Sequence, residues 1–506
     1  MLDTFSQLLF GFEVAFRPHN LVYAFLGCLM GTVVGILPGL GPLAAIALLL
    51  PLTYGIGDPA SSIIMLGAIV YGAMYGGAIT SILLKVPGDF AAVITVIDGH
   101  AMTRNGRGGP ALTISAISSW VGGTFAILGL TFVGPLIANW ALQFGPPEYF
   151  ALALIGVVLS ATLSGGKPLR GLMLAFVGML FGLIGLDDMA GVPRFTFGEV
   201  RLINGVDVVA VVMGLYGVGE ILVNLENRKD PKHSIGKVNG LMPSRQEWKE
   251  ASGSTMRGSL IGFVLGLLPG GGILLSTMVS YIAERRISKT PERFGQGAPA
   301  GVAAPEAANN AAATAGFVPL LTLGIPGNVL AAILLAALMI QNVQPGPMMI
   351  KEHPDVFWGV IASMYVGNVI LLILNLPLVW LWVRLLMVPF WILSGIVIMI
   401  SAIGAYSIAN DFFNVGLLAV SGIVGYIARK ANFEMGPFVM AFILANLLDV
   451  SFAQSLLMGD GDPMIMLQRP ISATLLGLAS LYLVVQFILI RRAKAEKIVD
   501  TVPSMD

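Results

Sequence analysis

Charged residues are scarce in this chain, and cysteine is almost absent. Only 11% of its 506 residues are Asp, Glu, Lys or Arg, whereas a soluble protein carries roughly a quarter. The formal net charge is +0, so nothing indicates the basic surface of a nucleic-acid-binding protein. The single cysteine, Cys28, excludes an internal disulfide framework and a cysteine-based metal site. The four histidines are scattered without the spacing of metal ligands.

Motifs of enzyme chemistry are also missing. The sequence has no His/Cys cluster and no nucleophile motif with a partner base. The glycine run Pro269–Gly272 is not followed by Lys-Ser/Thr, so it is not a phosphate-binding loop. We therefore expect no enzyme, no ATP-driven pump and no cofactor. Any transport should be driven by an ion gradient.

Long apolar runs are what the chain has in abundance. The residues are 56% hydrophobic, the mean hydropathy is +0.86, and uncharged runs recur from Leu21 onwards. Each is long enough to cross a bilayer, which takes about 20 apolar residues as helix. This pattern predicts an all-α polytopic membrane protein with about 11–12 transmembrane segments. One extra C-terminal helix, at about 471–490, should follow them.

The first 17 residues differ from these runs because they are amphipathic. Phe5, Leu9 and Phe12 alternate with Asp3 and Glu13. The stretch lacks the basic start and small-residue cleavage site of a signal peptide. We expect a helix that lies at the membrane interface.

Three motifs occur twice and in the same order, which indicates an internal repeat. The pairs are Gly35–Gly41 with Gly266–Gly272, Val86–Asp89 with Ile325–Asn328, and Val121-Gly122 with Val366-Gly367. The shifts are 266 − 35 = 231, 325 − 86 = 239 and 366 − 121 = 245, a slow drift that small insertions produce. The sequence therefore predicts two homologous transmembrane halves, 1–240 and 241–506, joined by a polar linker that starts near residue 224.

The basic loops predict the orientation of these halves. The linker Asn224–Arg257 and the tail Arg491–Lys494 are rich in Lys and Arg and should be cytoplasmic. In the first half the basic loops include Arg104–Arg107, whereas in the second half Arg429-Lys430 lies at the opposite end. This pattern fits inverted-topology repeats, an architecture that secondary transporters use.

Both halves contain two Pro-Gly breaks inside apolar segments. The breaks lie at Pro38-Gly39, Pro87-Gly88, Pro269-Gly270 and Pro326-Gly327. Proline removes a backbone N–H and glycine permits the turn that follows, so a break at bilayer depth must be buried in protein or line a cavity. The half-helix after a break points its N–H groups at that cavity and can bind a carboxylate. The carbonyls before it can bind Na⁺. The alternative is a simple proline kink.

Segment 258–283 has basic residues at both ends and is a candidate re-entrant hairpin.

Few ionisable residues lie inside the spans, where charge is costly. Lys85 and Asp89 flank one break. They either pair with each other or bind an anionic substrate and a cation, respectively. Glu306, Asn309 and Asn310 precede another break and offer oxygen ligands for Na⁺ or a proton relay. The alternative for them is a helix-cap cluster at the interface.

These features define the predicted substrate and ion site, with Na⁺ expected near Asp89, Glu306, Asn309 and Asn310 and no catalytic residues. The expected lining residues are Gly39, Gly41, Lys85, Gly88, Asp89, Glu306, Asn309, Asn310, Gly327 and Asn328. By contrast, Glu220 and Asp449 occupy similar late positions in the two halves and look like structural carboxylates, and Asp207 lies near the end of a span.

Several stretches of the sequence resemble the large permease subunit, TctA, of the bacterial tripartite tricarboxylate transporter family. They are Gly35–Pro42, Tyr75–Leu84, Asp98–Met102, Phe195–Gly198, Arg257–Gly272, Gly301–Asn310, Gly324–Gly327, Gln344–Pro347, Gly459-Asp460 and Arg469-Pro470. The likeness extends over nearly the whole chain. It departs from the family where Lys85–Asp89 replaces an Asn-Thr-Pro-Gly-Thr type of stretch, where Asp449 replaces a usual Glu, and where Asn328 replaces a small residue.

The resemblance implies a permease in the bacterial inner membrane that takes up tricarboxylates, dicarboxylates or related organic anions. Such permeases work with a periplasmic substrate-binding protein and a small integral membrane subunit. Their transport is secondary-active symport with Na⁺ or H⁺. A channel and a non-transporting membrane sensor or scaffold remain alternatives. A channel needs no binding protein, and a scaffold has no need of paired breaks.

Overall fold

The computed structural model describes residues 2–37, 40–88, 91–161, 168–226, 240–268, 272–385 and 390–499. These residues are almost entirely helical, and the strands among them are only two residues long. Within these described residues, seven helices are long and apolar enough to cross a membrane, and six shorter helices are apolar as well. The predicted all-α polytopic membrane class is confirmed.

The chain divides into two compact units, and each contains residues from both halves of the sequence. The first unit comprises Met1–Leu142 and Asp207–Met435. Its elements are α1 (Leu2–Ala15), α2 (Pro18–Ile36), α3 (Gly41–Leu49), η1 (Leu50–Ile56), α4 (Pro59–Leu84), α5 (Val93–Arg104), α6 (Gly108–Ala141), α9 (Val208–Val212), η4 (Met213–Val218), α10 (Gly219–Glu226), α11 (Arg245–Gly266), α12 (Gly272–Ile287), η5 (Pro291–Arg293), α13 (Pro299–Ala315), α14 (Phe317–Leu323), α15 (Val329–Ile340), α16 (Met349–Glu352), α17 (Pro354–Asn375), α18 (Val379–Leu385), α19 (Phe390–Ala409) and α20 (Phe412–Lys430).

The second unit comprises Gln143–Val206 and Gly436–Asp506. Its elements are α7 (Pro146–Ser160), α8 (Pro168–Gly182), β1 (Gly185–Leu186), β2 (Pro193–Arg194), η3 (Val200–Leu202), α21 (Gly436–Met458), α22 (Ile465–Gln468) and α23 (Pro470–Val499). The strands β1 and β2 are antiparallel, with Gly185 opposite Arg194. The predicted division at residue 240 concerns sequence homology and stays a prediction, because these units are defined by packing.

Helix α2 packs along α4 through a stripe of glycines. A Cβ on Gly27, Gly31 or Gly35 would lie 2.2–2.5 Å from a backbone carbonyl oxygen of α4, at Met65, Ile69 or Ala73 respectively. Only glycine allows two helix backbones to approach this closely, as in small-residue contacts between membrane helices.

Helix α11 packs along α13 in the same way. A Cβ on Gly258, Gly262 or Gly266 would lie 2.4–2.6 Å from the carbonyl oxygens of Ala304, Ala308 and Ala312. The two stripes occupy equivalent positions in the predicted repeat. Each glycine of α11 lies 231 residues after its counterpart in α2 (258 − 27, 262 − 31, 266 − 35). Each facing residue of α13 lies 239 residues after its counterpart in α4 (304 − 65, 308 − 69, 312 − 73). The packing therefore follows the repeat that the Pro-Gly motifs indicated.

The repeats also interlock. Helix α6 of the first half packs on α13 of the second, and α17 of the second half packs on α4 of the first. Gly122 makes the first contact close, because a Cβ there would lie 2.2 Å from the Ala307 carbonyl oxygen. In the second contact Tyr75 donates a hydrogen bond to Asn368 Oδ1 at 3.2 Å. The central helices α4 and α13 are thus each packed against helices of both halves.

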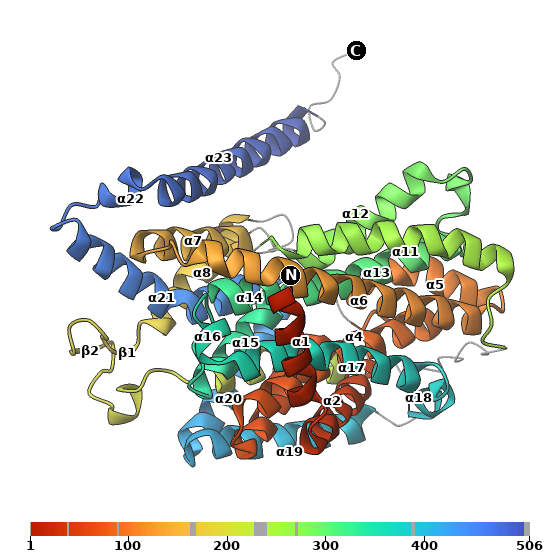
Figure 1. Ribbon diagram of the computed structural model, residues 1–506, viewed down its shortest axis with the longest axis horizontal. Coiled ribbons are helices and arrows are strands. Elements are labelled where there is room, and N and C mark those ends of the chain that lie inside the picture. The colour runs from red at the N-terminus through yellow and green to blue at the C-terminus, as the bar shows by residue number, and fades with distance from the viewer. Residues whose placement is uncertain are drawn as a thin grey trace. The chain divides into compact units, whose positions relative to one another are not determined.

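Helices α11 and α12 form an antiparallel hairpin and run side by side in Figure 1. At one end Arg257 of α11 makes two hydrogen bonds to Glu284 of α12, at 2.5 and 2.8 Å. At the other end a Cβ on Gly272 would lie 2.9 Å from the Gly266 Cα. A re-entrant hairpin requires this antiparallel geometry.

The N-terminal helix α1 packs on α17 (Figure 1). Gly11 allows the close approach, since a Cβ there would lie 2.3 Å from the Trp358 carbonyl oxygen, and Val14 is buried. Phe5 and Leu9 remain exposed. The helix therefore has one face on the protein and one apolar face free, and its interfacial position stays a prediction.

Candidate functional site

The break at Pro87-Gly88 follows the C-terminus of α4. Lys85 caps the helix in the left-handed conformation, with φ 62° and ψ 22°, and its side chain is exposed. Gly88 is buried against Gly77, because a Cβ on it would lie 2.2 Å from the Gly77 Cα. Asp89 lies outside the described residues, so both interpretations of the Lys85 and Asp89 charges remain predictions.

The corresponding break at Pro326-Gly327 lies between α14 and α15. Asn328 is the N-cap of α15, and its Oδ1 accepts a hydrogen bond from the Ala331 N–H at 2.9 Å. A Cβ on Gly327 would lie 3.6 Å from the Gly266 carbonyl oxygen and 3.7 Å from the Gly316 Cα. Since Gly266 ends α11 just before the other second-half break, the two second-half breaks meet.

The remaining breaks are partly outside the described residues. Gly39 and residues 269–271 are among those not described. Gly41, also predicted to line the site, opens α3 with φ 57° and is buried. Helix α3 packs on α4 and on α2, so the two helices of the first break also stay together.

Glu306 lies in the middle of α13 and is fully buried, with 0% of its surface exposed. Its Oε1 accepts a hydrogen bond from Thr95 Oγ1 of α5 at 2.5 Å. Its Oε2 accepts hydrogen bonds from Ser115 and Ser119 of α6, both at 3.2 Å. Two other helices, α5 and α6, therefore place hydroxyl oxygens around one carboxylate of α13. This position excludes the alternative of a cap cluster at a helix end.

The two asparagines near Glu306 are also buried, but they differ in hydrogen bonding. Asn310 Nδ2 donates to the Glu306 carbonyl oxygen at 3.2 Å. Asn309 is 1% exposed, and both its Nδ2 and its Oδ1 have no hydrogen-bond partner. Buried polar groups are almost always hydrogen-bonded, so such an exception calls for an explanation. An unpartnered carboxamide next to Glu306 is expected of a site that binds a polar ligand.

Thr95, Ser115 and Ser119 were not singled out by sequence reasoning. The only local signal was the spacing of Ser115 and Ser119, which places two hydroxyls on one face of a helix. Nothing in the sequence pointed from either segment to Glu306, because the contacts join residues 187 to 211 positions apart.

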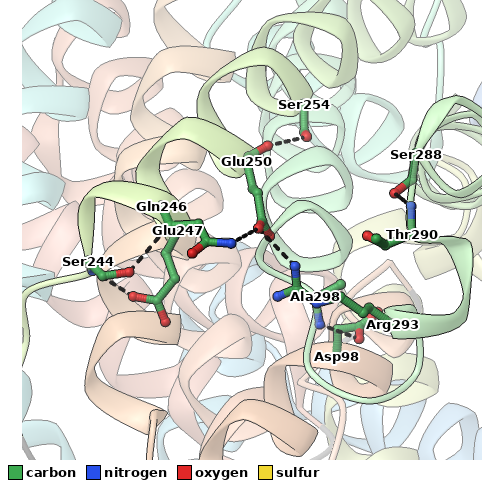
Figure 2. Close-up of polar contacts among 10 residues, drawn as sticks. All are labelled: Asp98, Ser244, Gln246, Glu247, Glu250, Ser254, Ser288, Thr290, Arg293 and Ala298. Carbon is green, nitrogen blue, oxygen red and sulfur yellow. Dashed lines mark hydrogen bonds and ion pairs between the residues drawn. The ribbon is translucent and has the colours of Figure 1, made fainter.

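Asp98, one turn after Thr95 on α5, connects α5 to the start of α13. Its Oδ1 accepts hydrogen bonds from the backbone N–H groups of Gly295, Gly297 and Ala298 at 2.8–2.9 Å. Its Oδ2 accepts one from the Tyr281 hydroxyl at 2.9 Å. Figure 2 shows Asp98 against Ala298. This fully buried carboxylate holds α5 in the position from which Thr95 reaches Glu306.

Ion pairs join the N-terminal half of α11 to its neighbours. Glu247 pairs with Arg107 before α6, and Glu250 pairs with Arg293 at 2.8 Å, the latter drawn in Figure 2. Partial burial raises the pKa of Glu247, but hydrogen bonds from Arg107 and from Ser244 outweigh it, and the pKa lies below its ordinary value.

Two pockets, of about 390 and 350 Å³, lie over these ion pairs. Both are lined by Glu250 and Arg293, and neither is lined by Glu306, Asn309 or Asn310. The charged side chains that line these pockets are mostly paired with a side chain of opposite charge. The buried carboxylate is therefore the stronger candidate for the site, and in this conformation it is closed to solvent.

The other carboxylates in apolar segments have structural partners, as predicted for Glu220 and Asp449. Glu220 pairs with Arg429, and Asp449 pairs with Arg194 at 2.7 Å. Asp207 caps α9 by accepting a hydrogen bond from the Ala210 N–H at 2.8 Å.

Comparison with known proteins gives one family and several relatives. The sequence pattern of the tripartite tricarboxylate transporter TctA family matches residues 21–440. An uncharacterized 52.8 kDa protein from the TAR-I ttuC' 3' region of Agrobacterium vitis is 43% identical over 498 residues, which is 98% of this chain and 99% of the relative. An uncharacterized protein from the TAR-II ttuC' 3' region of the same organism is 42% identical over 237 residues, 47% of this chain and 98% of the relative. No solved structure matches.

Proposed function

The chain belongs to the TctA family of tripartite tricarboxylate transporters, and from this membership we propose that it takes up small organic anions, coupled to an ion gradient. The carried anions are tricarboxylates, dicarboxylates or related carboxylates. The chain acts as the large permease of a binding-protein-dependent system. The single observation that carries the proposal is the fully buried Glu306, held by hydroxyls of two other helices.

The junction of the second-half breaks supports anion binding. The N-terminus of α12 at Gly272 and the break at Gly327 both lie next to Gly266. Helices α12 and α15 begin there, and the partial positive charge of a helix N-terminus favours a carboxylate. In the first half α3 begins at Gly41 and α4 ends at Leu84, just before the Pro87-Gly88 break, and we propose that these two helix ends form the corresponding junction. In this proposal the substrate carboxylates bind at the junctions, and the coupling ion binds at Glu306.

The partners and the location follow from the family. We propose a periplasmic binding protein that delivers the anion and a small integral membrane subunit that assembles with the permease. The permease lies in the bacterial inner membrane, with the central linker and the C-terminal tail on the cytoplasmic side, where basic segments are retained.

Reconstitution tests this function. The permease is placed in liposomes with the small subunit, and the binding protein is added outside with a radiolabelled tricarboxylate or dicarboxylate. We expect accumulation above equilibrium that requires a Na⁺ or H⁺ gradient. Glu306→Gln and Asn310→Ala should abolish it while the protein remains inserted. Flux that needs no gradient and saturates only at very high substrate would favour a channel. No flux of any anion would favour a sensor or scaffold.

A further inference from the structure

The three hydroxyls around Glu306 share one carboxylate as acceptor, unlike the many buried hydroxyls that donate to their own helix. Ser and Thr in helices commonly donate to the carbonyl four residues earlier in the same helix, as Thr131 does to Ile127 at 2.8 Å and Ser259 to Thr255 at 2.7 Å. Thr95, Ser115 and Ser119 instead donate to a carboxylate of another helix. All three are at most 3% exposed. Their hydroxyl protons are therefore all directed to the carboxylate of Glu306.

The repeat predicts an equivalent place for this arrangement, and the residues there are different. With the shift of 239, Glu306 corresponds to Gly67 and Asn310 to Tyr71. With the shift of 245, Ser115 and Ser119 correspond to Val360 and Met364. The carboxylate of the second half and the hydroxyls of the first half therefore meet once, and the equivalent positions, Gly67 with Val360 and Met364, carry neither group. The glycine stripe of α2 on α4 forms without a buried carboxylate at the position equivalent to Glu306.

The arrangement selects a ligand by charge and by donor type. Glu306 and the three hydroxyls contribute five side-chain oxygens, and hard cations prefer oxygen ligands. One carboxylate neutralises one positive charge. No group of three or more His, Cys, Asp or Glu that could hold a metal ion occurs among the described residues, so a divalent ion is disfavoured.

We propose that Glu306, Thr95, Ser115 and Ser119 form a binding site for a dehydrated monovalent cation, with Na⁺ as the ion to test. The proposal rests on the ion-coupled uptake proposed above and assigns its ion ligands. A hydroxyl has two acceptor lone pairs besides its proton. On binding, each hydroxyl rotates its proton away from Glu306 and turns a lone pair to the ion. The ion then joins α5, α6 and α13 through oxygen contacts.

Na⁺ binding to the purified permease tests this without substrate or partners. Thermal unfolding in detergent is followed while NaCl replaces choline chloride at constant ionic strength. We expect a saturable rise of the unfolding temperature for the wild type, because a ligand that binds only the native state stabilises it. Glu306→Gln should abolish the rise. For Thr95→Val and for the double variant Ser115→Ala/Ser119→Ala, the Na⁺ concentration at the midpoint of the rise should be about tenfold higher. A change in affinity of about tenfold is what the loss of one contact as strong as a hydrogen bond produces.

Two buried hydroxyls on the same helices provide matched controls. Ser118 of α6 shares a hydrogen bond with Thr255 Oγ1 at 2.9 Å, and Thr103 of α5 donates to the Ile82 carbonyl oxygen at 2.9 Å. Ser118→Ala and Thr103→Val should keep the wild-type Na⁺ midpoint. Thr95→Ser, which restores a hydroxyl, should recover most of the affinity lost in Thr95→Val.

Several outcomes would overturn the assignment. One is a wild-type Na⁺ midpoint in both Thr95→Val and the double serine variant. Another is a thermal shift that depends on pH but not on Na⁺, which would make Glu306 a proton carrier. If the double variant does not fold, the Thr95→Val and Thr95→Ser pair decides alone. Na⁺ binding with no anion uptake would refute the proposed function and leave the cation site standing, whereas proton-driven uptake without Na⁺ binding would do the reverse.

Discussion

Helices α4 and α13 occupy equivalent places in the two halves and differ in chemistry. Each packs on a glycine stripe, of α2 and α11 respectively. Where α13 carries Glu306, α4 has Gly67, whose nearest neighbours are the rings of Tyr71 and Phe317. The comparison teaches that the repeat preserves close backbone packing and leaves the interior side chains free to diverge. Only one half holds a buried carboxylate at this position, so the proposed ion site is not duplicated.

The largest expected effect tests the glycine stripes, which the two halves share. Gly31→Val and Gly262→Val should each destabilise the protein by more than about 3 kcal/mol, because a new Cβ would overlap a carbonyl oxygen. The yield of monodisperse protein and its thermal unfolding measure this. Gly416→Ala on α20, where a Cβ meets nothing within 4 Å, is the control and should be neutral or slightly stabilising. Tolerance at only one of the two sites would show that the stripes are not equivalent.

The next effect tests the difference between the two helices. Glu306→Gln should lower ion-driven uptake by more than about 100-fold, since it removes the charge that the cation neutralises. Tyr71→Phe on α4 should change uptake less than about twofold, because the Tyr71 hydroxyl has no hydrogen-bond partner. Initial rates in proteoliposomes of matched permease content are the measurement. Equal losses in the two variants would mean that the first half contributes chemistry as well.

The N-termini of α4 and α13 provide a third comparison. Helix α4 is capped locally by Asp58, which accepts a hydrogen bond from the Ser61 N–H at 3.0 Å, whereas the start of α13 depends on Asp98 of α5. Asp98→Ala leaves three backbone N–H groups, of which that of Ala298 is buried, and the buried Tyr281 hydroxyl without their acceptor, and it should cost about 2–3 kcal/mol. Asp58→Ala should cost about 1 kcal/mol, as for an ordinary N-cap. Denaturation of both variants under one condition ranks them, and the reverse order would contradict the positioning role of Asp98.

The smallest effect concerns ion pairs that α11 has and α2 lacks. With the shift of 231, Glu247 and Arg257 correspond to Phe16 and Leu26. Because the pKa of Glu247 is lowered in the folded protein, its contribution to stability is present above the unfolded-state pKa and is lost as the pH falls through the folded value. Arg107→Gln should weaken this acid sensitivity, leaving the part that depends on Ser244, with a change below about 1 kcal/mol at neutral pH. Unfolding temperatures measured across the acidic range test it. An unchanged pH profile in the variant would show that Arg107 does not lower this pKa.

Part of the candidate site was predictable from the sequence for a physical reason. Glu306, Asn309 and Asn310 are conspicuous because polar side chains are costly in an apolar helix, and all three are buried as expected. Lys85 attracted attention by the same logic, but it caps α4 with an exposed side chain. A charge next to a Pro-Gly break can therefore lie at the end of the helix and face outward, which local sequence does not distinguish from an inward position.

The sequence by itself determined the membrane class and the helix ends at Pro87-Gly88 and Pro326-Gly327, and it predicted the repeat. Each depends on composition or on local backbone chemistry, and apolar length, proline and glycine act within a few residues of themselves. Only the tertiary structure decided that Thr95, Ser115 and Ser119 meet Glu306. That meeting depends on which faces of α5, α6 and α13 pack together, and the residues involved are up to 211 positions apart. Hydroxyls are common in membrane helices and usually bond to their own backbone, so only the packing of three helices shows which of them share a carboxylate.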